Sequence, residues 1–207
     1  MKIVSYSRLL VTVLAGFVAA DWQFHSRPDL SPPRLNITVP AKANEVESGY
    51  IFIAAYGGFD PGNSGPEQPA AYIFRDNGDL IWSGLGYFAG WVANFRPDVW
   101  HGQPVLRAFQ GIFSTTRGRM FGHHVILNNR YEAIKSVKAP GHRFESAHEF
   151  RIVDGKTVLI ENPLVVPRDL RPWGGKAGQN WIISNGFQGL KAATDTVLSG
   201  ANSKCKN

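Results

Sequence analysis

The chain has 207 residues, of which 43% are hydrophobic, so it is long and apolar enough to bury a core and is not a disordered protein. Charged residues make up only 18%, while 22 glycines, 13 prolines and 12% aromatic residues favour short strands joined by turns over an all-helical fold. The formal net charge of +6 is too small and too scattered to indicate nucleic-acid binding.

The first 20 residues have the pattern of a secretory signal peptide. Lys2 and Arg8 precede the uncharged apolar run 9–18, and small residues at 18–20 (VAA) lead up to Asp21. An apolar run of about a dozen residues is shorter than the roughly 20 that span a bilayer, so no transmembrane segment is expected. We therefore expect residues 1–20 to be removed and the chain to be secreted, either extracellular or in the secretory pathway.

An extended N-terminal segment, residues 21–48, is expected next. It contains the N-x-S/T motif at Asn36, which predicts a glycosylation site on a surface loop of a secreted chain. Cys205 is the only cysteine, so no disulfide can form within the chain. Its polar surroundings in 199–207 argue against a redox or catalytic thiol.

Short β-rich runs bounded by turn residues recur between residues 49 and 188. They predict strands at 50–56, 70–75, 79–83, 91–95, 104–109, 123–127, 131–137, 146–153, 156–161 and 180–184. The pairs at 77–78 (NG), 128–129 (NN) and 154–155 (DG) predict hairpin turns, because these residues tolerate positive φ. The pattern indicates an all-β fold.

The hairpins are regularly spaced, with centres near Asn77, Gly102, Asn129, Gly155 and Ala177. Two hairpins make a four-stranded sheet, and such sheets repeating at roughly 50 residues have the period of β-propeller blades. An irregular β-sandwich is the alternative. Five hairpins make only about two to three blades, whereas a propeller closes with about four to eight. The spacing therefore leaves two interpretations of residues 49–188, an incomplete β-propeller and an irregular β-sandwich.

The end of the chain has a different character. Residues 189–207 carry no aromatic side chain and form a divergent polar tail. Leu190, Ala193 and Val197 would share one side of a marginal helix, which we expect to replace the next strand.

Three histidines near the starts of predicted strands are the candidate catalytic residues. In the strand predicted at 146–153, His148 would lie at the end of a buried apolar row with Phe150 and Ile152. There it would either bond a backbone carbonyl as a core residue or face a ligand in a central channel. His123 and His124 are adjacent, so their rings point to opposite faces and cannot chelate one metal together.

Other sites are not supported by the sequence. Zinc could draw on His123 or His124 with His148 and Glu149, but the helical zinc-protease pattern fails because Ile152 occupies the second histidine position. The glycines of 84–90 are spaced too widely for dinucleotide binding, and no serine nucleophile elbow occurs. We predict no metal and no cofactor.

Seven segments carry a resemblance to a known family. They are 26–40 (SRPDLSPPRLNITVP), 49–56 (GYIFIAAY), 76–97 (DNGDLIWSGLGYFAGWVANFRP), 102–111 (GQPVLRAFQG), 121–129 (FGHHVILNN), 142–161 (HRFESAHEFRIVDGKTVLIE) and the loop 173–181. In order and spacing they resemble the fungal arylsulfotransferase family of secreted or membrane-tethered β-propellers. The resemblance covers nearly all of residues 26–188.

The resemblance implies transfer of a sulfuryl group between phenols through a sulfohistidine, with an aryl sulfate or phenol as the small-molecule partner and no nucleotide donor. His148 matches the family's histidine-glutamate motif, and His123 or His124 its glycine-histidine-histidine motif. These three are the expected catalytic residues. Arg143 or Arg119 is expected to bind the sulfuryl oxygens, because a cation stabilises their charge.

Family members are longer, and the family pattern stops near Gln188. A partial propeller would leave an open blade edge. We therefore expect a truncated member that is catalytically weak or inactive, with pairing to another chain as a way to complete the propeller. The alternative is a non-catalytic secreted β-propeller fragment that binds a ligand or has no function.

Overall fold

The computed structural model describes residues 29–40, 42, 44–56, 67–114, 119–141, 143–191, 194 and 196–202. The expected signal peptide at 1–20 and Cys205 lie outside the described residues. So does His142, within one of the segments that resemble the family.

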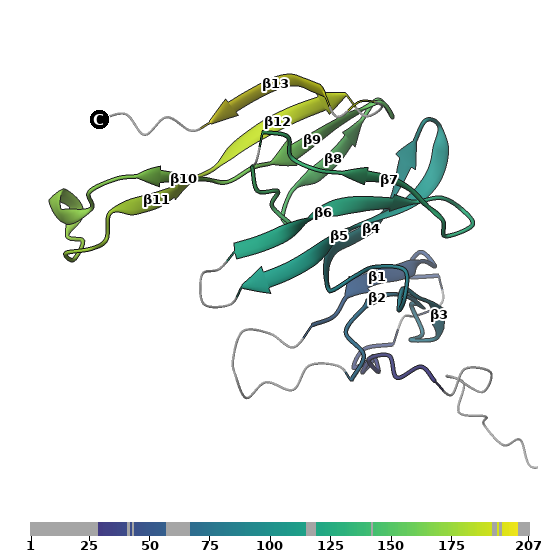
Figure 1. Ribbon diagram of the computed structural model, residues 1–207. Coiled ribbons are helices and arrows are strands. Elements are labelled where there is room, and N and C mark those ends of the chain that lie inside the picture. Colours follow the sequence, from purple (N-terminus) through teal and green to yellow (C-terminus); the bar gives the residue numbers. More distant parts are fainter. Residues whose placement is uncertain are drawn as a thin grey trace, which may run out of the picture.

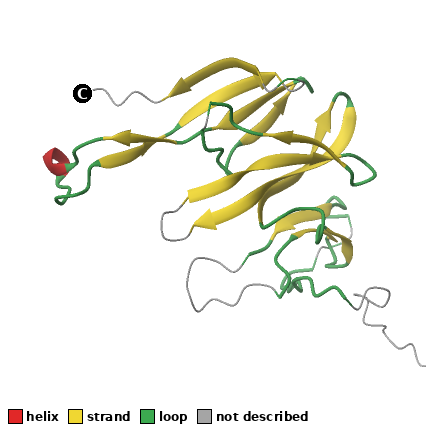
Figure 2. Ribbon diagram, viewed as in Figure 1, coloured by secondary structure: helices red, strands yellow, loops and turns green. Residues whose placement is uncertain are grey.

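Strands dominate the described part of the chain, which contains no α-helix (Figure 2). The strands are β1 (Tyr50–Ala54), β2 (Ala71–Arg75), β3 (Leu80–Ser83), β4 (Trp91–Trp100), β5 (Gln103–Ser114), β6 (Arg119–Leu127), β7 (Ala133–Val137), β8 (Phe150–Val153), β9 (Thr157–Glu161), β10 (Leu164–Pro167), β11 (Trp181–Ser184), β12 (Gly186–Lys191) and β13 (Thr196–Asn202). A 3₁₀ turn, η1 (Arg171–Trp173), lies between β10 and β11. The all-β class is confirmed. Among the described residues, no helix has the length and hydrophobicity needed to span a membrane.

In the part of the chain that the structure describes, the strands form four antiparallel sheets, none of which closes on itself. Their orders are β1-β2-β3, β4-β5-β6-β7, β13-β12-β9-β8 and β10-β11. Figure 1 shows the first three as stacked layers with the β4–β7 sheet in the middle, while the β10–β11 hairpin projects to one side as an arm.

The predicted hairpin turns are confirmed. They join β2 to β3, β4 to β5, β6 to β7 and β8 to β9, and the longer loop around Ala177 joins β10 to β11. At the β4–β5 turn, His101 and Gly102 have φ values of 49° and 75°, and Trp100 pairs with Gln103 across them. Two consecutive positive φ values are what a two-residue type I′ turn requires.

Two apolar layers lie on the two faces of the β4–β7 sheet, and a third, smaller cluster is built around Tyr72 and Phe74 of β2. Side chains alternate along β6, so Val125 and Leu127 pack toward the β1–β3 sheet while Ile126 packs toward β8 and β9. Trp82 belongs to the layer that faces the β1–β3 sheet, where it stacks on Phe95 with ring centroids 5.7 Å apart. The rings of Trp82 and Phe95 therefore pack between the β1–β3 and β4–β7 sheets.

Two sequence predictions about the secondary structure were wrong. The marginal helix expected from residue 189 is absent from the described residues; instead β12 pairs with β9 and β13 pairs with β12. Pairing with β9 buries Leu190 completely, and this tertiary contact outweighs the weak local helical pattern. The strand predicted at 146–153 begins only at Phe150, so His148 lies in the loop before it.

Candidate functional site

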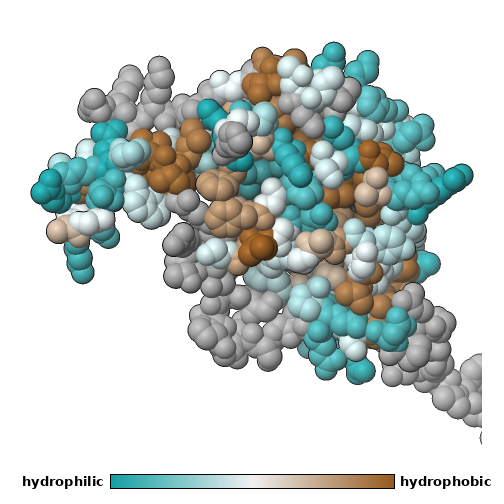
Figure 3. Space-filling model, in the orientation of Figure 1, coloured by the Kyte–Doolittle hydropathy of each residue, from teal (hydrophilic) through white to brown (hydrophobic). Residues whose placement is uncertain are grey.

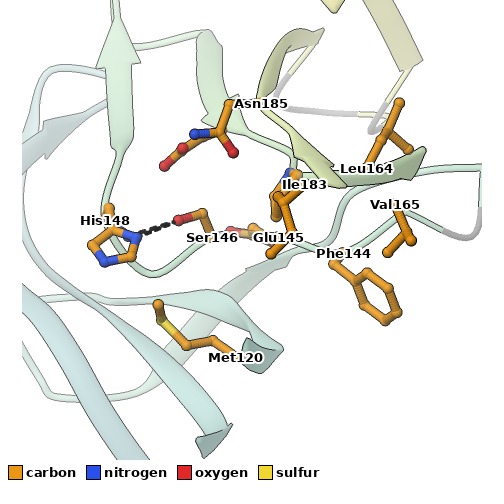
Figure 4. A pocket seen from close by; sticks show the side chains of 11 residues that line it. Met120, Phe144, Glu145, Ser146, His148, Leu164, Val165, Ile183 and Asn185 are labelled. Atoms are coloured by element: carbon orange, nitrogen blue, oxygen red, sulfur yellow. Dashed lines mark hydrogen bonds between the residues drawn. The ribbon is translucent and has the colours of Figure 1, made fainter. Parts of the chain in front are cut away.

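A pocket of about 300 Å³ lies where β6, the loop before β8 and the β10–β11 arm meet (Figure 4). Its apolar walls come from Met120, Phe144, Leu164, Val165 and Ile183. Its polar lining comes from Glu145, Ser146, His148, Glu161 and Asn185. Figure 3 shows hydrophobic residues gathered where the arm leaves the body, while the tip of the arm is hydrophilic. Apolar walls with a few converging polar groups are typical of small-molecule sites.

His148 lines this pocket as an exposed side chain held by its own loop. Its Nδ1 lies 2.8 Å from Ser146 Oγ, and its backbone N–H donates to the same oxygen at 3.2 Å (Figure 4). Within the described residues, no hydrogen bond is made by Nε2. The serine hydroxyl therefore orients the ring, and Nε2 is the ring nitrogen that makes no hydrogen bond to the described residues. Because the loop turns before β8 begins, His148 is not the buried end of a strand row that the sequence predicted.

His124 is buried beside the pocket wall. Its Nδ1 is hydrogen-bonded to the carboxylate of Glu145, which lines the pocket, and its ring stacks on Phe150 at a centroid distance of 4.2 Å. Burial lowers the pKa of His124 well below its ordinary value, and the positive charges of Arg107 and Arg96 act in the same direction. The ring is therefore uncharged at neutral pH.

A buried cation completes this region. Arg107 on β5 is 2% exposed; its Nε donates to Asp98 at 2.7 Å, and its guanidinium lies 5.0 Å from the ring centroid of Phe150. Burial lowers the pKa of Arg107, while the hydrogen bond to Asp98 raises it. The ion pair and the cation–π contact together stabilise a charge that would be costly alone.

The other expected site residues do not line the pocket. His123 points to the opposite face of β6 from His124, as predicted, and its Nε2 lies 3.3 Å from Gln110 Nε2. Burial, aided by the charge of Lys138, lowers the pKa of His123. Arg143 is half-buried and directly precedes the pocket residue Phe144.

Two expected residues are described only in part or lie elsewhere. The backbone of Arg119 pairs with Ser114 at the start of β6, one residue before the pocket residue Met120. Asn36 is exposed and belongs to the irregular segment before β1. As for metals, the described ranges contain no group of three or more histidine, cysteine, aspartate or glutamate residues that could hold an ion.

Sequence reasoning missed several residues of this site. Glu145 and Ser146 stand two or three positions before His148 in 142–161, and their spacing could have indicated a loop that folds back on the histidine. Asn94 and Arg107 gave no such signal. They reach the site only through the pairing of β4 and β5 and the stacking of sheets.

Comparison with known proteins links this region to one family. A family model described as Arylsulfotransferase (ASST) matches residues 96–202, just over half of the chain. The matched region includes all three candidate histidines and every pocket-lining residue. No curated protein and no solved structure matches the chain.

Proposed function

Because the chain belongs to the arylsulfotransferase family, we propose that it binds the ring of an aryl sulfate or phenol in the pocket and transfers a sulfuryl group through His148. The observation that carries this proposal is the contrast between the two histidines. His148 is exposed at the pocket with Nε2 unengaged by the described residues, whereas His124 is 0% exposed with both nitrogens facing polar partners.

The proposed reaction has two steps. First, Nε2 of His148 attacks the sulfur of the aryl sulfate, the sulfur–oxygen bond breaks, and the leaving phenoxide keeps the electron pair and takes a proton from water. The ring keeps its Nδ1 proton as it becomes cationic, and Nδ1–H donates a hydrogen bond to Ser146 Oγ. In the second step, the oxygen of another phenol attacks sulfur and loses its proton to water, and the nitrogen–sulfur electron pair returns to His148.

The charges around the pocket support slow turnover. Among its described lining residues there is no arginine or lysine, and the carboxylates of Glu145 and Glu161 oppose a sulfuryl anion. We propose that Arg143 and Arg119, each one residue from a lining side chain, supply the positive charge when the site is assembled. As it stands, the chain would be a weak or inactive catalyst.

The larger assembly is also a proposal. The β4–β7 sheet is a four-stranded antiparallel meander stacked between two other sheets, which is how propeller blades pack. We propose that these sheets are two to three blades of an incomplete propeller that another chain completes. We further propose that residues 1–20 direct secretion and that Asn36, which is exposed, is glycosylated.

Intact-protein mass spectrometry after incubation with 4-nitrophenyl sulfate tests the reaction. We expect an adduct of about 80 Da, located on His148 by fragmentation and lost when phenol is added. The variant His148→Gln should form none. The matched control His123→Gln, on the other face of β6, should still form it.

A folded wild-type chain that forms no adduct, or forms it on another histidine, would overturn the role of His148. Absence of any adduct would favour the alternative function, a non-catalytic secreted β-propeller fragment that binds a phenol or has no function. Titration with phenol, followed by the chemical shifts of the residues lining the pocket, would separate those two possibilities.

A further inference from the structure

Asn94 stands out because of its backbone and its position. It lies within β4 at an irregularity where the pairing with β5 shifts between Ala93 and Arg96, and its φ is +50°. A non-glycine residue in this region is uncommon, and within a strand it requires the surrounding structure to hold it. Asn94 lies just outside the residues matched by the family model.

Two arginines fix the orientation of the Asn94 amide. Its Oδ1 accepts hydrogen bonds from Arg96 at 2.6 Å and from Arg107 at 3.4 Å. Guanidinium groups only donate, so the oxygen of the amide must lie on their side. The NH₂ group therefore faces the opposite way, where Nδ2 lies 3.4 Å from His124 Nε2 and 3.3 Å from the backbone oxygen of His148.

This orientation decides where the proton of His124 resides. An amide NH₂ only donates, so Nε2 of His124 must accept, and the ring proton must be on Nδ1. Nδ1 is the nitrogen bonded to the Glu145 carboxylate, which can only accept when ionised. The contacts at both ring nitrogens thus agree on one tautomer. The other charged or titratable groups that act on His124 are Arg107 on β5, Arg96 on β4 and His123 on β6.

We infer that Asn94 is a positioning residue whose amide keeps the proton of His124 on Nδ1 and, with the same NH₂ group, anchors the His148 carbonyl at the pocket wall. Asn94 does not line the pocket and touches His148 only through its backbone. The importance of the anchor for sulfuryl transfer rests on the proposed function, whereas the tautomer and the anchor are properties of the fold.

Nitrogen NMR of histidine-labelled protein tests the tautomer directly in the wild type. We expect His124 to be protonated on Nδ1 and not on Nε2 at pH 7. In Asn94→Asp, a carboxylate oxygen replaces the NH₂ group opposite Nε2, so His124 should gain a second proton at the same pH. Glycine tolerates the positive φ at this position, so Asn94→Gly should fold, and the ring of His124 should stay uncharged in it. The amide signal of Glu149, whose nitrogen is bonded to the carbonyl carbon of His148, should shift.

Asp154→Gly is the matched control. Asp154 has a φ of +51° in the β8–β9 turn, so the variant changes a comparable backbone position without touching His124. This variant should leave the ring nitrogen signals of His124 and the amide signal of Glu149 unchanged. If sulfuryl transfer occurs, Asn94→Gly should slow adduct formation at least about tenfold, because displacing a reactive group by about 1 Å can cost a hundredfold.

A wild-type His124 protonated on Nε2, or an Asn94→Asp variant whose His124 stays uncharged at pH 7, would overturn the inference. An unmoved Glu149 signal in Asn94→Gly would overturn the anchor. Absence of a sulfuryl adduct in wild-type protein that has the expected tautomer and anchor would contradict the proposed function and leave this inference standing.

Discussion

Replacing Asp98 with asparagine removes the carboxylate that neutralises a buried guanidinium. Arg107 has a side chain only 3% exposed, and its Nε lies 2.7 Å from Asp98 Oδ2, whereas the Asp98 side chain is 23% exposed. Breaking a fully buried ion pair by removing one partner costs about 3–5 kcal/mol, because the remaining charge is left without compensation.

The cost should be smaller here for two reasons. Water reaches part of residue 98, and Arg107 keeps its hydrogen bonds to the backbone and side-chain oxygens of Asn94 and its contact with the ring of Phe150. We therefore expect Asp98→Asn to lower the free energy of unfolding by about 2–3 kcal/mol. Urea unfolding followed by tryptophan fluorescence measures this difference.

Asp169→Asn is the matched control, because it makes the same chemical change in an exposed ion pair of the same length. Asp169 Oδ2 lies 2.7 Å from Arg171 Nη2, yet both side chains are well exposed. Solvent screening leaves such pairs little effect on stability, so no measurable change is expected. An equal decrease in the free energy of unfolding in the two variants, or a decrease below about 1 kcal/mol for Asp98→Asn, would refute the reasoning that burial decides the effect.

Two further predictions concern buried polar groups. Burial holds the pKa of His124 well below 6.5 in the folded chain, so as the pH falls this histidine is protonated first in the unfolded chain. The free energy of unfolding should therefore decrease below about pH 6.5, by up to about 1.4 kcal/mol per pH unit. Urea unfolding at several pH values should show a shallower slope in His124→Gln, and an unchanged slope would contradict this origin. Asn162 is fully buried, and its side-chain nitrogen and oxygen have no hydrogen-bond partner among the described residues, so Asn162→Val should raise the free energy of unfolding by about 1 kcal/mol. A lower stability in thermal or urea unfolding would show instead that the amide is hydrogen-bonded in solution.

Local features of the fold were predictable from the sequence. Gly78, Gly102 and Gly155 mark turns because tolerance of positive φ is a property of single residues, and all three have positive φ in the turns that the structure contains. The opposite directions of His123 and His124 follow from strand alternation alone.

Features that depend on distant pairing were not predictable. Asn94 meets His124 across 30 residues and His148 across 54, and these contacts need both the shift in β4 pairing and the stacking of two sheets. The same holds for β13, whose residues form a strand because β12 offers them an edge. A pattern read along the chain contains neither the register nor the stacking.

The two larger sheets touch near both ends of β4, and this limits how the molecule can move. At one end the backbone N–H of His101 donates to the carbonyl of Gly155 at 3.2 Å, joining two hairpin turns; near the other end lies the contact between Asn94 and His148. These two separated hydrogen bonds oppose a hinge motion between the sheets. We therefore expect the two sheets to move as one rigid body, with amide hydrogens that exchange together. Among the described residues, the β10 and β11 strands pair only with each other. Any widening of the pocket for a larger ring would therefore come from the arm and not from the sheets.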